Sequence, residues 1–341
     1  MSGGQDYFRP LVQIGPARPD NAMVLAGGWG WFTHLEVLAR GRQPAVIPLK
    51  EVPCEVLKRL CAPRGVIGGL GMEIPRVMGI LNATPDSFSD GGLHAAPPDA
   101  IAAGIAMRDA GADILDIGGE STRPGAETVA DNEEIRRVVP VIEGLREAGV
   151  KSLISVDTRK TAVAEAAVAA GAGLVNDVSG FTYDAGLAPF AADHSLPVCV
   201  MHALGDPATM QQDPQYDDVL LDVYDFLSRQ IEMLVLAGVS RDRIVADPGI
   251  GFGKTLEHNL TLLARLSLFH GLGVPVLLGA SRKRFIGTIG KAEQADTRMS
   301  GSLGVALAVL SHGIQVLRVH DVAETVQAIA LWRAATAGRQ E

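Results

Sequence analysis

The chain has 341 residues, of which 47% are hydrophobic and 20% are charged, and its formal net charge is −9. This length and composition allow a large buried core, so we expect one large domain, alone or with an appendage, rather than a disordered chain. The acidic balance lacks the electrostatic footprint of a protein that wraps nucleic acid or lies on an anionic membrane, so local basic residues must hold any anionic substrate.

Residues 1–75 do not follow the pattern of the rest of the chain. The apolar segments 22–28 and 44–49 are predicted to form a hairpin, and the amphipathic segment 52–60 a helix. Because a segment of this length supports only a marginal core, we expect Trp29 and Trp31 to pack on the following domain or on a second subunit. A separate ligand-binding module is the alternative, but the segment has no clustered ligating or phosphate-binding residues.

From about residue 76 the chain repeats one theme eight times: a short apolar run, a polar loop and a longer Ala- and Leu-rich stretch. Segment 97–112 shows clear helix signals, with Pro and Asp at its start, apolar residues at helical spacing and Gly111 at the position of a C-terminal cap. The eight predicted strands are 76–81, 113–118, 152–157, 173–178, 197–201, 243–248, 275–280 and 315–320.

This alternation predicts an α/β fold, a (β/α)8 TIM barrel with an N-terminal extension. Continuous apolar strands are buried on both faces, and strands that alternate with helices pair in parallel through right-handed crossovers. Eight units over about 260 residues match the usual size of such a barrel. An open doubly wound sheet is the competitor, but no GxGxxG follows the first predicted strand. We therefore divide the chain into an extension, residues 1–75, and a barrel, residues 76–341.

Polar side chains follow the carboxyl end of every predicted strand. The loops at that end build the active site of a barrel, whose interior is otherwise packed with apolar side chains. Each residue alone could equally be a helix cap or part of a hydrogen bond at the barrel rim. Their presence at every strand favours a functional site. In chain order they are Asn82, Asp116, Thr122, Arg123, Asp157, Asn176, Asp177, His202, Asp247, Ser281, Lys283, Arg318 and His320.

The residue types indicate two kinds of ligand. Basic side chains can hold a phosphate or pyrophosphate, which many barrels bind after strands seven and eight. The basic candidates are Arg123, Lys283, Arg318 and His320. The carboxylates of Asp157 and Asp247, beside the amide of Asn176, suit a flat heterocycle with several N–H donors, because a carboxylate accepts two parallel hydrogen bonds. A pterin or a guanine presents such an edge.

Metal and covalent chemistry are less clearly indicated. Asn82 offers a neutral oxygen, and Mg²⁺ often takes only one or two protein oxygens together with phosphates and waters. His202 and His320 lie on different predicted strands, so a zinc site is not indicated. The motif GxSxG is missing, which argues against a nucleophilic serine. The run DPGIGFGKT fails the spacing of a P-loop and is interpreted as a turn-rich loop.

Cysteine usage and targeting signals bear on the compartment. The three cysteines, Cys54, Cys61 and Cys199, lack CxxC spacing and suggest neither a disulfide framework nor a zinc site. The N-terminus lacks a basic region followed by an apolar core, and no apolar run approaches the roughly 20 residues of a membrane helix. We therefore expect a cytoplasmic protein without nucleic-acid or membrane partners.

Six long motifs resemble those of the dihydropteroate synthase family and follow its order over about residues 76–335. They are MGILNATPDSFSDGG at 78–92, DIGGESTRPGA at 116–126, SVDTRK at 155–160, VNDVSG at 175–180, DPGIGFGKT at 247–255 and ASRKRFIG at 280–287. One departure is Ala83, where the family more often has valine, a change that alters packing more than chemistry.

The resemblance implies a TIM-barrel transferase of folate biosynthesis. Such an enzyme joins 6-hydroxymethyl-7,8-dihydropterin pyrophosphate to 4-aminobenzoate and yields 7,8-dihydropteroate and pyrophosphate. The resemblance also implies Mg²⁺ as cofactor and a homodimer as the assembly. The family's sulfonamide inhibitors bind where the aminobenzoate binds, so the chain is expected to be a sulfonamide target.

The resemblance also implies roles for individual residues. A metal contact is implied at Asn82, and a pyrophosphate site at Asn82, Arg123, Arg318 and His320. The implied pterin pocket consists of Asp157, Asn176, Asp247 and Lys283. The implied aminobenzoate site consists of Thr122, Arg123, Pro124, Phe252 and Ser281. The residues expected to act in catalysis are Asn82, Thr122, Arg123, Asp157, Lys283, Arg318 and His320.

The implied reaction is dissociative: pyrophosphate leaves the pterin methylene with Mg²⁺, and the arylamine then attacks. An arylamine is unprotonated at neutral pH, so no strong general base is required. A pterin-dependent methyltransferase is one alternative, but it needs no pyrophosphate site, and the pair Arg318 and His320 argues against it. A non-catalytic pterin-binding barrel is the other, and the intact polar residues at the strand ends argue against that.

Overall fold

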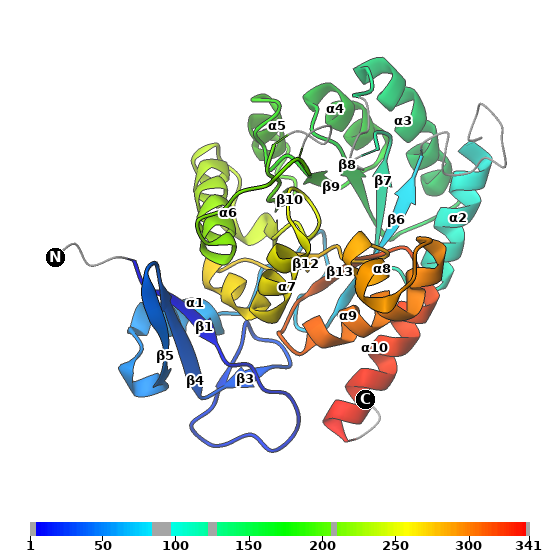
Figure 1. Cartoon of the computed structure of the whole chain (residues 1–341). Coiled ribbons are helices and arrows are strands. Elements are labelled where there is room, and N and C mark those ends of the chain that lie inside the picture. Colours follow the sequence, from blue (N-terminus) through cyan, green and yellow to red (C-terminus); the bar gives the residue numbers. More distant parts are fainter. Residues whose placement is uncertain (1–4, 84–96, 122–127, 206–209, 339–341) are drawn as a thin grey trace.

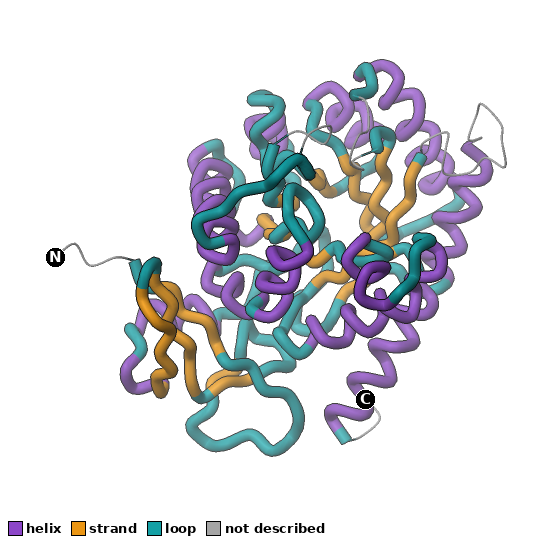
Figure 2. The backbone as a smooth tube through the Cα atoms, in the orientation of Figure 1, coloured by secondary structure: helices purple, strands orange, loops and turns teal. Residues whose placement is uncertain are grey.

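The computed structural model describes residues 5–83, 97–121, 128–205 and 210–338, and its centre is a ring of parallel strands surrounded by helices (Figure 1). Figure 2 shows the same arrangement by element type, with strands inside and helices outside. The strands of the ring are β6 (Arg76–Asn82), β7 (Ile114–Gly118), β8 (Leu153–Asp157), β9 (Leu174–Asp177), β10 (Val198–Met201), β11 (Ile244–Asp247), β12 (Leu277–Leu278) and β13 (Val316–Val319).

The ring confirms the predicted eight-stranded barrel. Its strand order is β11-β10-β9-β8-β7-β6-β13-β12, and every pairing within it is parallel. A parallel bridge between Ala246 and Val276 links β11 to the residue just before β12, so the first and last strands of that order also meet. Seven of the eight strands lie within the segments predicted for them, and β6 extends one residue beyond its segment, to Asn82. Runs buried on both faces leave a strong apolar signal.

Helices follow the strands and cover the outside of the barrel. Helix α2 begins and ends as expected, with Gly111 just beyond it at φ 100°, a conformation that favours glycine. Within the residues that the structure describes, no helix has both the length and the apolar character needed to cross a bilayer. The covering helices are α2 (Pro97–Asp109), α3 (Asp131–Glu147), α4 (Thr161–Ala170), α5 (Leu187–Asp193), α6 (Val219–Leu236), α7 (Leu256–Ala264), α8 (Arg284–Gly290), α9 (Met299–Leu310) and α10 (Val322–Ala337).

The extension has its own small sheet and core. Strands β1 (Tyr7–Pro10), β4 (His34–Ala39) and β5 (Arg42–Pro48) form an antiparallel sheet, and β2 (Met23–Val24) pairs with β3 (Trp31–Phe32). Helix α1 (Cys54–Cys61) packs beside them. Leu25, Phe32, Leu35 and Leu60 are among the buried residues of this core.

The predicted pairing of segments 22–28 and 44–49 is wrong, although the helix at 52–60 is confirmed. Segment 44–49 pairs with β4, and segment 22–28 contributes only the short strand β2. The physical reason is the two-residue connection of Arg40 and Gly41, whose glycine has φ 68°, a conformation suited to a tight hairpin turn. This turn makes β4 the neighbour of β5.

Several contacts join the extension to the barrel helices. The Tyr7 hydroxyl donates to the Asp225 carboxylate of α6 at 2.9 Å, and Arg40 forms an ion pair with the same carboxylate at 2.7 Å. The Trp29 indole donates to the Leu310 carbonyl at 2.9 Å, and its ring packs edge-on against another tryptophan, in α10. Trp31 instead donates within the extension, to the Gly15 carbonyl at 3.2 Å.

Candidate active site

Inward-facing side chains of alternate strands form two layers of opposite character. Strands β7, β9, β11 and β13 alternate around the ring, and residues two apart along a strand point to the same side. The layer nearer the amino ends is apolar and consists of Ile114, Leu174, Val245 and Val316. The layer two residues further is polar and consists of Asp116, Asn176, Asp247 and Arg318. The polar layer begins where the apolar core of the barrel ends.

Arg318 lies at the centre of a hydrogen-bonded group inside the barrel. Its Nε donates to Asp116 Oδ2 at 2.6 Å, and its Nη2 donates to Asp157 Oδ2 at 2.7 Å. The Asn176 amide nitrogen donates to the same Asp116 oxygen at 3.1 Å. Because β6 separates β13 from β7, and β8 separates β7 from β9, these side chains meet across the barrel interior.

Two carboxylates share the single guanidinium of this group. Burial raises the pKa of Asp157, against the attraction of Arg318. Burial disfavours the charged form of Arg318, but Asp116 and Asp157 outweigh that effect and raise its pKa. The second oxygen of Asp116, Oδ1, is buried and has no hydrogen-bond partner among the described residues. A buried acceptor of this kind is costly unless a ligand donates to it.

Asp247 and Lys283 form the other half of the group. The Asp247 carboxylate accepts a hydrogen bond from the Gly249 amide at 2.7 Å. Burial raises the pKa of Asp247, whereas the nearby Lys283 ammonium lowers it. Burial lowers the pKa of Lys283 to about 7. A Cβ atom added to Gly279 would lie 3.8 Å from both Asp247 Oδ2 and Arg318 Cβ, so the two halves face the same space.

Phe252 and Ser281 flank the lysine. The Lys283 ammonium lies 4.3 Å from the centre of the Phe252 ring and donates to the Ile250 carbonyl. Ser281 Oγ accepts from the His320 backbone amide at 3.2 Å and lies 3.0 Å from His320 Nδ1. The structure therefore places the loops after β11, β12 and β13 side by side at the barrel mouth.

The remaining strand-end residues differ in exposure and in the groups that they contact. Asn82 ends β6 and is partly exposed at the mouth. Asp177 accepts from the Ser179 amide at 2.7 Å and the Phe181 amide at 2.7 Å, so it stabilises a turn. The His202 side chain is buried, its Nδ1 lies 2.8 Å from Lys254 Nζ, and burial together with the nearby Lys254 lowers its pKa to about 2. The contacts of Asp177 are those of a hydrogen bond at the barrel rim, whereas His202 contacts a buried lysine.

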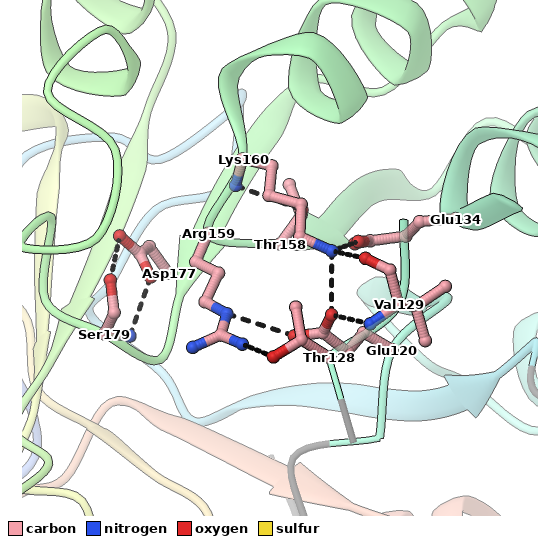
Figure 3. A network of polar contacts seen from close by, with 9 residues as sticks. All are labelled: Glu120, Thr128, Val129, Glu134, Thr158, Arg159, Lys160, Asp177 and Ser179. Carbon is pink, nitrogen blue, oxygen red and sulfur yellow. Dashed lines mark hydrogen bonds and ion pairs between the residues drawn. The ribbon is translucent and has the colours of Figure 1, made fainter. Parts of the chain in front are cut away.

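Thr122, Arg123 and Pro124 lie outside the described residues. A charged network joins the chain on either side of them (Figure 3). Glu120 precedes the segment and accepts from the Val129 amide beyond it at 2.8 Å. Lys160 Nζ donates to Glu120 at 2.7 Å and to the Val129 carbonyl at 2.5 Å, and Arg159 donates to Glu120 at 3.0 Å and to the Thr128 hydroxyl at 3.0 Å.

Sequence reasoning assigned no role to Glu120, Arg159 and Lys160, although all three fall in the motifs it used. Arg159 and Lys160 lie two and three residues beyond the end of β8, close to the strand-end position that identified Asp157. Their signal was therefore available. Asp116 was noted as a strand-end residue, but its place between Arg318 and Asn176 depends on contacts between distant parts of the chain.

No three His, Cys, Asp or Glu side chains come together in a metal-binding cluster within 5–83, 97–121, 128–205 and 210–338. Asn82, the last residue of β6, offers a neutral amide oxygen at the mouth of the barrel. A single protein oxygen fits Mg²⁺ that takes its other ligands from a phosphate substrate and water, and it does not fit zinc.

Comparison with known proteins gives a consistent result. The sequence profile described as pterin binding enzyme matches residues 78–320. A dihydropteroate synthase of Escherichia coli is 44% identical over 271 residues, which cover 80% of this chain and 95% of the relative.

Solved structures agree in both sequence and fold. A Xanthomonas albilineans dihydropteroate synthase with 4-aminobenzoic acid is 48% identical, with a TM-score of 0.75, and the match covers 81% of this chain and 98% of that one. A structure of a dihydropteroate synthase from the same organism in complex with 7,8-dihydropteroate is 45% identical, with a TM-score of 0.72, and the match covers 81% and 99% of the two chains.

Proposed function

This chain belongs to the dihydropteroate synthases of the pterin-binding enzyme family, and we propose that the polar layer of its barrel is where a dihydropterin and 4-aminobenzoate are joined. The chain is a transferase with dihydropteroate synthase activity in folate biosynthesis, and its substrates are a pterin and 4-aminobenzoate. The observation that carries the placement is the group of Asp116, Asp157 and Arg318 inside the mouth of the barrel.

We assign the pterin to the space between the two halves of the polar layer. The pterin ring has an amidine-like edge with several N–H donors, which pairs with carboxylates. Asp247 would accept from this edge, and Asp157 and Asn176 would contact the opposite side of the ring. Lys283 would donate to a ring acceptor. The unpaired Oδ1 of Asp116 supports this placement, because a bound donor would satisfy it.

We place the aminobenzoate beside the pterin, nearer the barrel rim. Phe252 supplies an apolar face and Ser281 a hydroxyl on one side, and Thr122, Arg123 and Pro124 would complete the site from the second loop. The network of Glu120, Arg159 and Lys160 supports this, because it ties both ends of that loop to the barrel. The arylamine nitrogen would then face the pterin methylene.

We assign the pyrophosphate of 6-hydroxymethyl-7,8-dihydropterin pyrophosphate to Asn82, Arg123, Arg318 and His320. Asn82 would hold Mg²⁺, with the pyrophosphate and waters supplying the other ligands. When bound, Mg²⁺ would neutralise charge on the departing pyrophosphate. No acceptor among the described residues bonds Arg318 Nη1, which leaves this group to donate to the anion.

In the proposed reaction the bond between the pterin methylene carbon and the pyrophosphate oxygen breaks first. The electron pair leaves with pyrophosphate, and positive charge spreads from the methylene into the ring. The negative carboxylates of Asp157 and Asp247 stabilise this positive charge, and Arg318 and His320 bind the pyrophosphate anion. The arylamine nitrogen then bonds to the methylene and releases a proton to solvent, giving 7,8-dihydropteroate. Lys283 orients the ring and limits access of water, while Thr122 and Arg123 orient the arylamine.

The test is an assay of purified protein with the pterin pyrophosphate, 4-aminobenzoate and Mg²⁺, in which 7,8-dihydropteroate and pyrophosphate are both measured. We expect equal amounts of the two products. Reactions without 4-aminobenzoate and reactions of the Asp247→Asn variant serve as controls, and both should be strongly reduced. Absence of pyrophosphate release by the intact protein would contradict the proposal.

We further propose that the chain works in the cytoplasm as a homodimer, with residues 1–75 as an extension of a catalytic barrel, residues 76–341. The net charge of −9 supports a protein that binds small molecules rather than nucleic acid or membranes. Sedimentation velocity of the intact chain and of a chain that starts near residue 62 would test the assembly. A monomer at working concentration would contradict the dimer.

A further inference from the structure

Lys254 is a buried lysine that the proposed reaction does not use. It follows the loop after β11 and is 3% exposed. Its Nζ lies 2.8 Å from His202 Nδ1, 2.9 Å from the Gly249 carbonyl oxygen and 3.0 Å from the Phe252 carbonyl oxygen. A weaker contact, of 3.3 Å, reaches the His202 carbonyl oxygen. Two carbonyls of one short loop, together with His202, thus converge on a single amine.

Lysines hold this loop from two sides. Lys254 binds the carbonyls of Gly249 and Phe252 from the buried side. Lys283 donates to the intervening Ile250 carbonyl from the side of the barrel mouth and lies over the Phe252 ring. The loop is also packed tightly, because a Cβ on Gly249 would lie 1.9 Å from the His202 carbonyl oxygen. The position of the Phe252 ring therefore depends on a lysine that does not itself reach the mouth.

We propose that Lys254 is a positioning residue for 4-aminobenzoate: its contacts fix the main chain of Phe252 and so hold the Phe252 ring against Lys283 at the aminobenzoate subsite. This inference rests on the function proposed above. Lys254 acts through Phe252 and touches neither substrate.

The structure predicts that Lys254 affects one substrate more than the other. Phe252 is anchored by the bond from its amide to the Gly249 carbonyl at 3.1 Å and by the contact of its own carbonyl with Lys254. Asp247, the proposed pterin contact, belongs to β11, pairs with Met201 of β10 and has a carbonyl that accepts from the His202 amide at 3.0 Å. The strand ladder thus holds the main chain of Asp247 in place without Lys254.

The contacts themselves matter more than the charge on Lys254. Burial lowers the pKa of Lys254, and the ammonium of Lys283 adds to this effect. A charged Nζ donates to His202 Nδ1, whereas a neutral amine accepts from Nδ1 when the ring proton lies there. Both forms still donate to the carbonyls of Gly249 and Phe252. Methionine, with a similar length and no hydrogen-bond donor, is therefore the informative replacement.

The experiment compares steady-state constants of Lys254→Met with those of the intact enzyme. We expect the KM for 4-aminobenzoate to rise by about tenfold or more, because the loop loses two carbonyl contacts. The KM for the pterin pyrophosphate should change by less than about threefold. An equal rise in both constants would indicate a general structural role and overturn the inference, as would no change in either.

A double-mutant cycle provides a sharper test. If Lys254 acts through the Phe252 ring, Lys254→Met should raise the KM for 4-aminobenzoate by no more than about twofold when Phe252 is already leucine. Additive effects of the two substitutions would overturn the inference. Lys151→Met, which changes an exposed lysine, is the matched control and should alter neither KM.

Melting temperature and circular dichroism establish that each variant is folded. If Lys254→Met does not fold, Lys254→Gln, whose shorter side chain brings its donor less far into the loop, should raise the KM for 4-aminobenzoate more than the KM for the pterin pyrophosphate. If this inference fails, the intact enzyme is active, and the ratio of the KM for 4-aminobenzoate to the KM for the pterin pyrophosphate is the same in the Lys254 variant as in the intact enzyme. Failure of the proposed function would appear as an intact protein that forms no dihydropteroate.

Discussion

The two inward layers of the barrel lie only two residues apart along the same strands, yet they have opposite roles. The apolar layer of Ile114, Leu174, Val245 and Val316 is closed from below by Ile67 and Met72, residues that precede the barrel. The polar layer above it holds a charged group in two halves, and only a few hydrogen bonds within the protein stabilise these charges. Burying carboxylates is costly without paired charges, so the apolar layer must supply stability that the polar layer does not.

This comparison teaches where stability and binding should separate. A substitution in the apolar layer should lower the free energy of unfolding and leave substrate binding intact. A substitution in the polar layer should weaken substrate binding and change the free energy of unfolding less, because the groups of this layer face the ligand. The following predictions test that separation, from the largest expected effect to the smallest.

Leu174→Ala removes a fully buried side chain of the apolar layer, two residues before Asn176. We expect the free energy of unfolding to fall by about 2–5 kcal/mol, because the cavity cannot close fully. Urea denaturation measures this loss. The KM values of folded enzyme should stay within about twofold of those of the intact chain. A large change in KM at unchanged stability would show that the layers are not separable.

Asp247→Ala removes a carboxylate of the polar layer. Calorimetry with a dihydropterin should show affinity reduced by about 1.5–3 kcal/mol or more, roughly 10- to 200-fold, because charged hydrogen bonds to the ring are lost. Val245→Ala, two residues earlier on the same strand, is the matched control and should affect stability instead. Unchanged pterin affinity in Asp247→Ala would remove Asp247 from the pocket.

The stability of the polar layer should depend on pH through Lys283. Burial lowers its pKa to about 7 from an ordinary value of 10.5, so between these values the unfolded chain binds more protons than the folded one. The contribution of Lys283 to stability is therefore present at high pH and is lost as pH falls through about 7. Relative to Lys283→Met, the intact chain should gain about 1 kcal/mol per pH unit from pH 7 to 9. Parallel curves would contradict this.

Tyr7→Phe tests a contact far from both layers. The hydroxyl donates to the Asp225 carboxylate, which keeps its ion pair with Arg40 after the substitution. We expect a loss of about 0.5–1.5 kcal/mol in the free energy of unfolding, measured by urea denaturation, with no change in either KM. A change in KM would mean that the extension communicates with the barrel mouth.

Much of the fold could be predicted because its signals are local. Each barrel strand is an apolar run of a few residues, and some helices begin at a capping side chain, such as Asp218 for α6 and Thr255 for α7. The extension was harder to predict. The partner of segment 44–49 was decided by the Arg40 and Gly41 turn, a weak signal beside the stronger hydrophobicity of segment 22–28.

The site was predicted in part, and the reason is again the range of the interactions. Strand-end position identified Asp157, Asn176, Asp247 and Arg318, which the structure brings together. The same rule gave equal weight to His202, whose side chain turns instead to Lys254 in the core. Roles for individual residues came from the family resemblance, and they remain predictions that the substitutions above can test.

By itself, the sequence determined the repeat of strands and helices, the apolar run of each strand with polar residues at its end, and the family. These properties depend on neighbours within a few residues. Only the tertiary structure decided which polar residues share one space. Arg318 reaches Asp116 across 202 residues of sequence, and Lys254 reaches His202 across 52. Closure of the barrel sets such contacts, because the stagger between strands determines which inward side chains lie at the same height.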